Sequence, residues 1–246
     1  MERVSESLRS EMAPTGVLRA GINVGNPVIA QRDPQGGDPR GVGPALAALV
    51  AKQLEVPLRY VVFDTAGKLA DAAKEKAWDV AFLAVDPARA VDIEFTAPYA
   101  HIEGTYLVTE ESPLRNLADF DRAGAKIAVG KKTAYDLFLS REIKHAQIVR
   151  AESSQAAIDL YLQGGIDAVA GVRQLLAAVA TQRPGFRVIE GSFMVIRQAA
   201  GVPRGRPLAA HYLADFIEAA KASGFVARAL RESGVSDVSV APARDA

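Results

Sequence analysis

The stretch WDVAFLAVDPARAVDIEFTAPY, residues 78–99, decides the fold that we expect for this chain. It begins with an apolar run, residues 80–85, that is typical of a buried strand, and the run ends at Asp86 and Pro87. Arg89 follows directly after this break. In an open α/β sheet, small anions bind where strands end, and a guanidinium group pairs well with them. The stretch therefore predicts an anion-binding turn after a central strand.

Upstream of this stretch, strand patterns alternate with helix patterns. Apolar residues recur with a period of two or in β-branched runs in the strands, and at helical spacing in the helices. The expected strands are residues 18–22, 56–63 and 80–85, and the expected helices are residues 44–54 and 67–76. Between them, QRDPQGGDPRG, residues 31–41, predicts an exposed hairpin-like turn. The alternation favours a mainly parallel sheet with helices on its faces.

The chain after Tyr99 repeats this architecture. A crossing strand, residues 101–108, leads out of the first lobe, and residues 187–196 carry the chain back. The second lobe is expected to contain strands at residues 126–129, 147–150 and 167–171, and helices at residues 133–142, 154–163 and 172–182. Two helices, residues 208–223 and 226–233, then complete the first lobe before a loose tail of about a dozen residues.

We therefore expect an α/β protein of two lobes joined by a two-strand hinge. Residues 1–102 and 195–246 form lobe 1, and residues 103–194 form lobe 2. Each lobe is a mainly parallel sheet flanked by helices. A ligand cleft between the lobes would be lined by the loops at the strand ends.

Composition excludes several classes of function. The chain has 246 residues, of which 49% are hydrophobic, with 29 basic and 29 acidic residues. Such a length suffices for one or two cores without a partner chain, so we expect a monomer. Balanced charge argues against nucleic acid as a partner. No apolar run approaches the roughly 18 residues of a spanning helix, so we expect no membrane-embedded segment.

The first sixteen residues, MERVSESLRSEMAPTG, bear on localisation. They are polar and of mixed charge, and they contain no apolar segment of the kind found in secretory signal peptides. Two interpretations stay open. Either a signal peptide has been removed and the protein is periplasmic, or the protein is cytoplasmic.

The motifs that would indicate a cofactor, a metal or a nucleophile are incomplete. Gly41 and Gly43 form only part of a dinucleotide-binding fingerprint and follow a loop instead of a strand. The run at residues 130–133 lacks the spacing of a phosphate-binding loop. The three histidines are isolated, there is no cysteine, and no G-x-S-x-G motif occurs. We therefore expect no cofactor, no metal and no catalytic residue, and we expect Trp78 to pack in the core.

Three segments, taken in order, resemble a known family. They are WDVAFLAVDPARAVDIEFTAPY at residues 78–99, ESPLRNLADFDRAGAKIAVGKKTAYD at residues 111–136, and AIDLYLQGGIDAVAG at residues 157–171. Together they resemble the type II periplasmic solute-binding proteins, specifically family 3, the polar amino acid receptors of ABC importers. The resemblance extends over residues 18–233. It implies a non-catalytic receptor that closes on a small solute and delivers it to a membrane permease.

The resemblance also implies which residues bind the solute. Arg89 would pair with a ligand carboxylate, because its planar fork matches two carboxylate oxygens. Thr133 and the backbone N–H groups at Ala134 would bind the same carboxylate from the turn that opens a helix. The alternatives are a solvated surface arginine and an ordinary helix cap. Asn26 lies in the first loop, where a hydrogen bond to a polar ligand group and a loop-stabilising Asx turn are both open.

One position departs from the family pattern. Amino acid receptors of this family carry an Asp shortly after the DAV strand to hold the ligand ammonium, and Val172 stands there in this chain. A buried ammonium without a counter-charge is costly. The ligand is therefore expected to be a carboxylate without an α-amino group, unless Asp64, Asp86 or Glu103 meets the ammonium.

Two other functions remain alternatives. The same scaffold resembles cyclohexadienyl dehydratase, a lyase that needs a general acid, but residues 168–176 contain no Asp, Glu or His. Glu103 or Asp86 would then have to supply the proton. The third option is a soluble sensor whose closed form meets a signalling partner instead of a permease.

Overall fold

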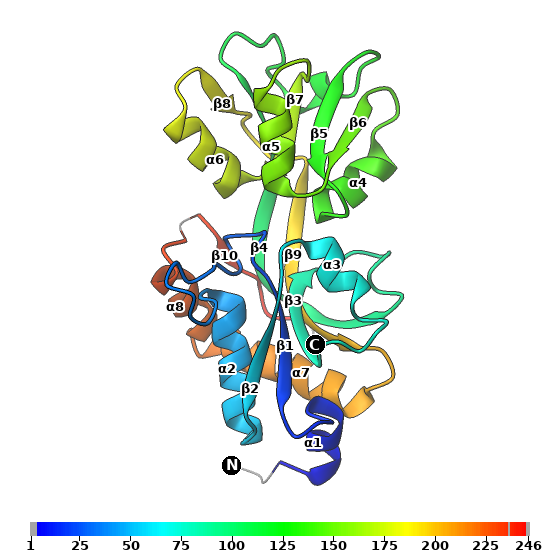
Figure 1. Cartoon of the computed structure of the whole chain (residues 1–246), viewed down its shortest axis with the longest axis vertical. Coiled ribbons are helices and arrows are strands. Elements are labelled where there is room, and N and C mark those ends of the chain that lie inside the picture. The colour runs from blue at the N-terminus through cyan, green and yellow to red at the C-terminus, as the bar shows by residue number, and fades with distance from the viewer. Residues whose placement is uncertain (1–3, 236, 245–246) are drawn as a thin grey trace. The chain divides into compact units, whose positions relative to one another are not determined.

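The structure is a computed structural model that describes residues 4–235 and 237–244. It divides into two compact units (Figure 1). Unit 1 comprises the chain up to His101 and from Arg197 onward, and unit 2 is Ile102–Ile196. Two long strands, β4 (Ile93–Thr109) and β9 (Met194–Pro203), each contain one of the two boundaries. The lobe boundaries expected from the sequence lie at residues 102/103 and 194/195, and the boundaries between the two units lie at residues 101/102 and 196/197.

The strands of unit 1 have the order β2-β1-β3-β9-β4, because the first part of β4 belongs to this unit. β1 runs parallel to both β2 and β3, whereas β3 is antiparallel to β9. The three parallel strands are β1 (Leu18–Asn23), β2 (Leu58–Phe63) and β3 (Val80–Ala84). The helices are α1 (Glu6–Met12), α2 (Val42–Leu54), α3 (Ala66–Asp71), α7 (Pro207–Ala222) and α8 (Phe225–Glu232). Because β1, β2 and β3 are parallel, their carboxyl ends lie at one edge of the sheet.

The sheet of unit 2 has the strand order β4-β7-β5-β6, and β8 pairs with β4. β5 is parallel to β6 and β7, and β4 is antiparallel to β7 and β8. The strands besides β4 are β5 (Lys126–Gly130), β6 (Gln147–Ala151), β7 (Ala168–Val172) and β8 (Phe186–Val188). The helical segments are the 3-10 helix η1 (Leu117–Phe120), α4 (Ala134–Glu142), α5 (Ser154–Leu162) and α6 (Arg173–Gln182).

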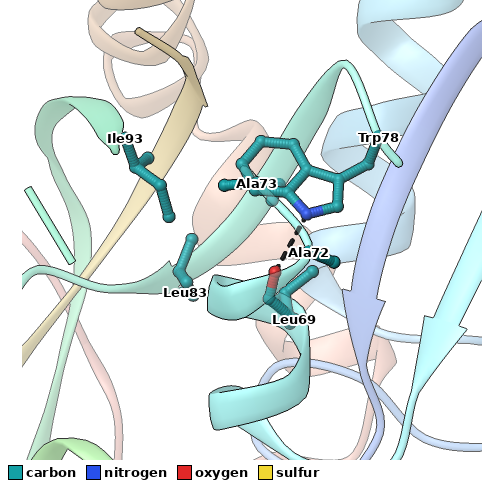
Figure 2. Close-up of a cluster of buried hydrophobic side chains, with 7 residues drawn as sticks. Leu69, Ala72, Ala73, Trp78, Leu83 and Ile93 are labelled. Atoms are coloured by element: carbon teal, nitrogen blue, oxygen red, sulfur yellow. Dashed lines mark hydrogen bonds between the residues drawn. The ribbon is translucent and has the colours of Figure 1, made fainter. Parts of the chain in front are cut away.

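A cluster around Trp78 holds α3 against the sheet of unit 1 (Figure 2). Trp78 is fully buried, and its indole Nε1 donates a hydrogen bond to the carbonyl oxygen of Leu69 over 2.9 Å. Gly21 permits this packing, because a Cβ there would lie 2.6 Å from the Leu69 side chain and 3.0 Å from the indole. Removing a buried Trp side chain typically costs about 3–5 kcal/mol. The prediction that Trp78 packs in the core is confirmed.

Unit 2 has its own core, in which α5 and α6 cover the sheet. The cluster contains apolar residues from β4, β5 and β7 together with the inward faces of α5 and α6, namely Leu107, Ala128, Ala157, Ile158, Tyr161, Val169 and Leu176. Every residue of β7 is buried, as the uninterrupted apolar sequence AVAGV predicts for a strand covered on both faces. Each unit therefore buries a core of its own.

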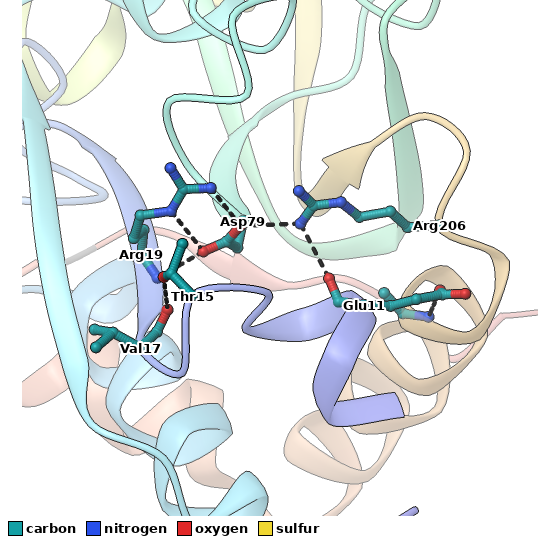
Figure 3. A network of polar contacts seen from close by, with 7 residues as sticks. Glu11, Thr15, Val17, Arg19, Asp79 and Arg206 are labelled. Carbon is teal, nitrogen blue, oxygen red and sulfur yellow. Dashed lines mark hydrogen bonds and ion pairs between the residues drawn. The ribbon is translucent and has the colours of Figure 1, made fainter. Parts of the chain in front are cut away.

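A buried carboxylate joins the starting edge of the unit 1 sheet to two helices (Figure 3). Asp79 has no exposed surface and accepts hydrogen bonds from Arg19 Nε at 2.9 Å and Nη2 at 2.7 Å. Arg206 Nη1 donates two hydrogen bonds of 3.0 Å, one to the Asp79 carboxylate and one to the carbonyl oxygen of Glu11. The hydrogen bond with Asp79 raises the pKa of Arg19 above its ordinary value, although burial opposes the shift. The network thus fixes β1, β3, α1 and the start of α7 together.

Several expected elements are confirmed, with shifts of a few residues at their ends. The hairpin-like turn at residues 31–41 is closed by a bridge between Gln31 and Arg40, whose backbone N–H groups donate over 2.7 and 2.9 Å. The helix expected at residues 67–76 is shorter and ends at Asp71. Tight turns follow it, with Lys76 in the left-handed region at φ 51°. These turns bring the chain to Trp78.

Other expectations need correction. The crossing strand expected at residues 101–108 begins already at Ile93, because Pro98 does not interrupt the extended backbone. The prediction of a loose tail after the last helix is wrong for β10 (Ser239–Val240). This strand pairs with His101 and Ala100 of β4. At the other end of the chain, α1 was not predicted, and the Ser5 hydroxyl caps it by accepting from the Leu8 N–H over 3.2 Å. The serine cap, the buried Met12 and the hydrogen bonds of Glu11 with Arg206 and Ala209 stabilise this short helix.

Candidate functional site

Four of the predicted site residues follow the carboxyl ends of the parallel strands in unit 1. Asn26 comes after β1, Asp64 after β2, and Asp86 and Arg89 after β3. The loops after β1 and β2 touch, since a Cβ on Gly25 would lie 2.2 Å from the carbonyl oxygen of Asp64. The structure therefore places these residues at one edge of the unit 1 sheet.

Arg89 is buried at this edge, with 5% of its surface exposed. Its Nη1 donates a 2.8 Å hydrogen bond to the carbonyl oxygen of Ala84, the last residue of β3. The backbone forms a tight turn in which the Arg89 N–H donates to the Asp86 carbonyl over 3.0 Å. Arg89 thus lies in a turn and not at the start of a helix.

Burial decides the electrostatics of Arg89. Desolvation lowers the pKa of its guanidinium to about 10, against the opposing effects of Asp86 and Asp71. At neutral pH the group therefore stays protonated. Asp86 is buried too, and its carboxylate accepts from the Ala88 N–H over 2.8 Å, which fixes the turn. This edge of unit 1 thus combines a buried cation with a rigid backbone.

Asn26 and Asp64 have partners within unit 1. The side-chain oxygen of Asn26 accepts from the Val28 N–H over 3.2 Å, which is the Asx turn named above as the alternative to ligand contact. Asp64 forms an ion pair with Arg32, and both side chains are largely exposed. An exposed pair of this kind contributes little to stability.

The other four predicted residues lie in unit 2. Thr133 and Ala134 follow β5, Val172 ends β7, and Glu103 lies in β4 beside Gly104, which pairs with Val172. Because β5 and β7 are parallel, their carboxyl ends lie at one edge of the unit 2 sheet. The structure therefore gathers this second set at a strand edge as well.

Thr133 caps α4. Its hydroxyl accepts from the Asp136 N–H over 3.2 Å and donates to the carbonyl oxygen of Gly130 over 2.8 Å. The first backbone bond of the helix runs from the Leu137 N–H to the Thr133 carbonyl at 3.0 Å. The N–H groups of Ala134 and Tyr135 therefore precede the hydrogen-bonded part of the helix, where backbone donors commonly bind anions. The helix start offers backbone donors, while the hydroxyl proton is already used.

Glycine is required at the start of this turn. A Cβ on Gly130 would lie 2.7 Å from the backbone nitrogen of Ser154. That close approach connects the turn to the start of α5, whose N-cap is Ser153. The Tyr135 hydroxyl adds a 2.8 Å hydrogen bond to the Ser154 side chain. The turn is thus supported by the start of α5 besides its own helix.

Val172 is buried, with 7% of its surface exposed, and supplies no charge at the end of β7. The next residue, Arg173, pairs with Glu103 at 2.5 Å and also donates to the carbonyl oxygen of Gly191. The sequence analysis did not include Arg173 among the site residues. The rule that singled out Arg89, a cation directly after a buried strand, would have found it.

Two further findings concern the described residues. They contain no group of three or more His, Asp or Glu side chains that could hold a metal ion. None of the helices in the described part of the chain combines the length and apolar character that crossing a bilayer requires.

The fold and the two strand-end edges define the class of protein, and known proteins then identify the family. Two α/β units linked by two strands are the architecture of type II periplasmic binding proteins, and the expected fold class is confirmed. The profile of the bacterial extracellular solute-binding proteins, family 3, matches residues 18–232. The chain therefore belongs to this family, as the sequence motifs predicted. No curated protein sequence matches it.

Solved structures with the same fold include binding proteins. ArgBP from T. maritima, in a mutant form, has a TM-score of 0.79 at 20% identity, covering 92% of this chain and 99% of that chain. A protein described as a binding component of an ABC transporter from Wolinella succinogenes, complexed with lysine, has a TM-score of 0.78 at 20% identity, covering 91% and 97%. The ancestral amino acid-binding protein AncCDT-1, described as a precursor of cyclohexadienyl dehydratase, has a TM-score of 0.77 at 20% identity, covering 93% and 99%. Such low identity shows the fold alone.

Proposed function

We propose that this protein binds a small carboxylate-bearing solute through Arg89 of unit 1, and that the turn at residues 130–134 of unit 2 is a second anion-binding element. The observation that carries the proposal is the buried guanidinium of Arg89 at the carboxyl end of β3, which burial holds at a lowered pKa of about 10. A carboxylate that reached this guanidinium would offset the cost of its burial. Charge-assisted hydrogen bonds of this kind contribute roughly 1.5–3 kcal/mol each.

The second contact is proposed to come from backbone N–H groups. Ala134 lies at the first position of α4, where the N–H groups and the helix dipole favour a negative charge. Thr133 would contribute chiefly by holding this turn, because its hydroxyl proton already goes to Gly130. Asn26 is proposed to contact polar parts of the solute with its side-chain amide.

The solute is proposed to lack an α-ammonium group. Val172 offers no charge, and two of the three carboxylates that could replace an acidic residue there have cationic partners in their own units, namely Asp64 with Arg32 and Glu103 with Arg173. The third, Asp86, is buried close to Arg89, whose charge it stabilises. An amino acid is the alternative, and the lysine complex of the Wolinella protein supports it.

The biological role is proposed to be uptake through an ABC-type importer, with a permease as the partner. The family name places its members outside the cytoplasm, and the Wolinella protein is described as part of an ABC transporter. A receptor is favoured over a lyase. Residues 168–176 carry no acidic side chain or His, and Glu103 is held by Arg173, so a general acid is not evident there.

A thermal-shift screen tests this proposal. Purified protein is incubated with 2-oxo acids, hydroxy acids, dicarboxylates, opines and L-amino acids, in parallel with the Arg89→Ala variant. We expect a carboxylate without an α-amino group to raise the melting temperature of the wild type and to leave that of the variant unchanged. An equal shift in both proteins would remove Arg89 from the site. A response of the wild type to L-amino acids alone would refute the assignment of solute class.

A further inference from the structure

The carboxylate of Asp136 connects three elements around the turn that opens α4. Its side chain is only 4% exposed. It accepts hydrogen bonds from the Lys132 N–H at 2.7 Å and from Arg150 Nε at 2.9 Å. Ser140 lies one turn further along the helix, with its hydroxyl 3.3 Å from the same carboxylate and 2.7 Å from Arg150 Nη2. One buried group thus joins the turn, α4 and β6.

The turn needs such support because its backbone is strained. Lys132 is not a glycine, yet it adopts the left-handed conformation with φ 57°. Non-glycine residues in this region persist only where surrounding contacts hold them. The hydrogen bond from the Lys132 N–H to Asp136 fixes the peptide that carries the strain. Without it, the turn would relax.

The same residue also fixes the capping threonine. The Asp136 N–H donates to the Thr133 hydroxyl over 3.2 Å, while the Asp136 carboxylate reaches back to Lys132. Ala134 lies between these contacts, so the direction of its N–H depends on them. The charge of Asp136 would by itself repel an anion at the helix start, and the ion pair with Arg150 offsets it.

We propose that Asp136 is a positioning residue that holds the turn at residues 130–134 in the conformation that binds the carboxylate. The inference rests on the proposed function, because it assumes that a carboxylate binds this turn. Asp136 itself does not touch the solute. Its contribution is the geometry of the backbone donors.

Three variants separate positioning from plain stability. Asp136→Ala removes the acceptor for Lys132, whereas Asp136→Asn keeps an oxygen that can accept from Lys132 and lacks the charge. Asp121→Ala is the matched control, since the Asp121 carboxylate accepts backbone N–H groups of Lys144, His145 and Ala146 in a different loop of unit 2. All three are expected to lower the melting temperature.

Solute affinity and amide hydrogen exchange distinguish a positioning role of Asp136 from a purely stabilising one. Calorimetry with the carboxylate that stabilises the wild type should give roughly tenfold weaker binding for Asp136→Ala and wild-type affinity, within about threefold, for Asp136→Asn and Asp121→Ala. Hydrogen exchange without any solute should be at least about tenfold faster at the Lys132 amide in Asp136→Ala, and unchanged there in Asp121→Ala.

The outcomes distinguish this inference from the proposed function. If Asp136→Ala binds the carboxylate as well as the wild type does, or exchanges its Lys132 amide at the wild-type rate, the positioning role is refuted and the carboxylate site stands. If Asp136→Asn fails as badly as Asp136→Ala, geometry alone is not the reason and the inference is refuted. If no carboxylate binds the wild type, the proposed function fails and this inference fails with it.

Discussion

Charged side chains are buried at both ends of the parallel strands of unit 1, with opposite effects on the arginines there. We call the end where β1 and β3 begin the starting edge, and the end where these strands stop the finishing edge. At the starting edge, the carboxylate of Asp79 is surrounded by Arg19 and Arg206, and the hydrogen bond with Asp79 raises the pKa of Arg19. At the finishing edge, burial lowers the pKa of Arg89 even though Asp86 and Asp71 oppose the shift. The fold thus favours the protonated form of Arg19 at the starting edge and disfavours that of Arg89 at the finishing edge.

This difference teaches where to look for function. An arginine whose charge is stabilised on balance by the surrounding chain, as at Arg19, contributes to the fold. An arginine for which burial outweighs the nearby acids gains most from an additional anion. The finishing edge is also where open α/β sheets meet their ligands. Removing charges at the two edges should therefore affect different properties of the protein.

The largest effect is expected at the starting edge. Asp79→Ala leaves two arginines without their buried carboxylate, and we expect the free energy of unfolding to fall by about 3–5 kcal/mol. Urea denaturation followed by circular dichroism measures this loss. Arg59→Ala serves as the control, because Arg59 lies on an exposed position of β2 and outside the network. A loss under 1 kcal/mol for Asp79→Ala would show that the two edges do not differ as described.

A smaller effect, on affinity, is expected at the finishing edge. Arg89→Lys keeps the positive charge and loses the planar fork, so affinity for the carboxylate should fall about 10- to 100-fold. Isothermal titration calorimetry provides the measurement, with Arg59→Lys as a control on an exposed position of β2. Full affinity in Arg89→Lys would mean that charge without geometry suffices.

The turn at residues 130–134 of unit 2 extends the comparison, because it offers backbone N–H dipoles where the finishing edge of unit 1 offers the charge of Arg89. Thr133→Ala removes the cap of α4 and should lower the free energy of unfolding by about 1 kcal/mol. Affinity should fall less than tenfold, since the donors are backbone groups. Thr133→Ser, which keeps the hydroxyl, should restore both properties. A loss of affinity as large as that of Arg89→Lys would assign the hydroxyl a direct role.

The smallest effect is expected from pH. With a pKa of about 10, Arg89 stays protonated from pH 6 to 9, and a solute carboxylate with an ordinary pKa near 4 stays ionised. Affinity should therefore be constant across this range and decline only as pH rises through about 10. Burial of this charge reduces folding stability by an amount that does not change with pH in this window, and because the lowered pKa is about 10, stability should rise only as pH increases above that value. Weaker binding between pH 8 and 9 would instead indicate a solute α-ammonium group losing its proton.

The sequence predicted the elements of the fold well and their ends less well. Apolar periodicity is a local property, so β3 and the strands of unit 2 could be located from it. The start of β4 at Ile93 could not, because Pro98 is a common strand breaker and only the pairing partners show that the chain remains extended there. β10 was missed for the same reason, since two residues gain their strand conformation from β4.

The candidate site shows a similar division. Residues at strand ends could be predicted, because a parallel sheet brings those ends to one edge. The partners of Glu103 could not, since Arg173 is 70 positions away in the chain. The role proposed for Asp136 depends on the left-handed backbone at Lys132, which no sequence pattern indicates for a lysine. Long-range pairs and backbone strain therefore have to come from the structure.

The central claim, that Arg89 receives a solute carboxylate, is tested most directly by a double-mutant cycle. Affinities of the wild type and Arg89→Ala are measured by calorimetry for the best carboxylate and for its carboxamide analogue. If Arg89 binds the carboxylate, the carboxamide should bind the wild type at least about 100-fold more weakly, and Arg89→Ala should bind both compounds with nearly equal, low affinity. A variant that still discriminates as strongly as the wild type would contradict the claim.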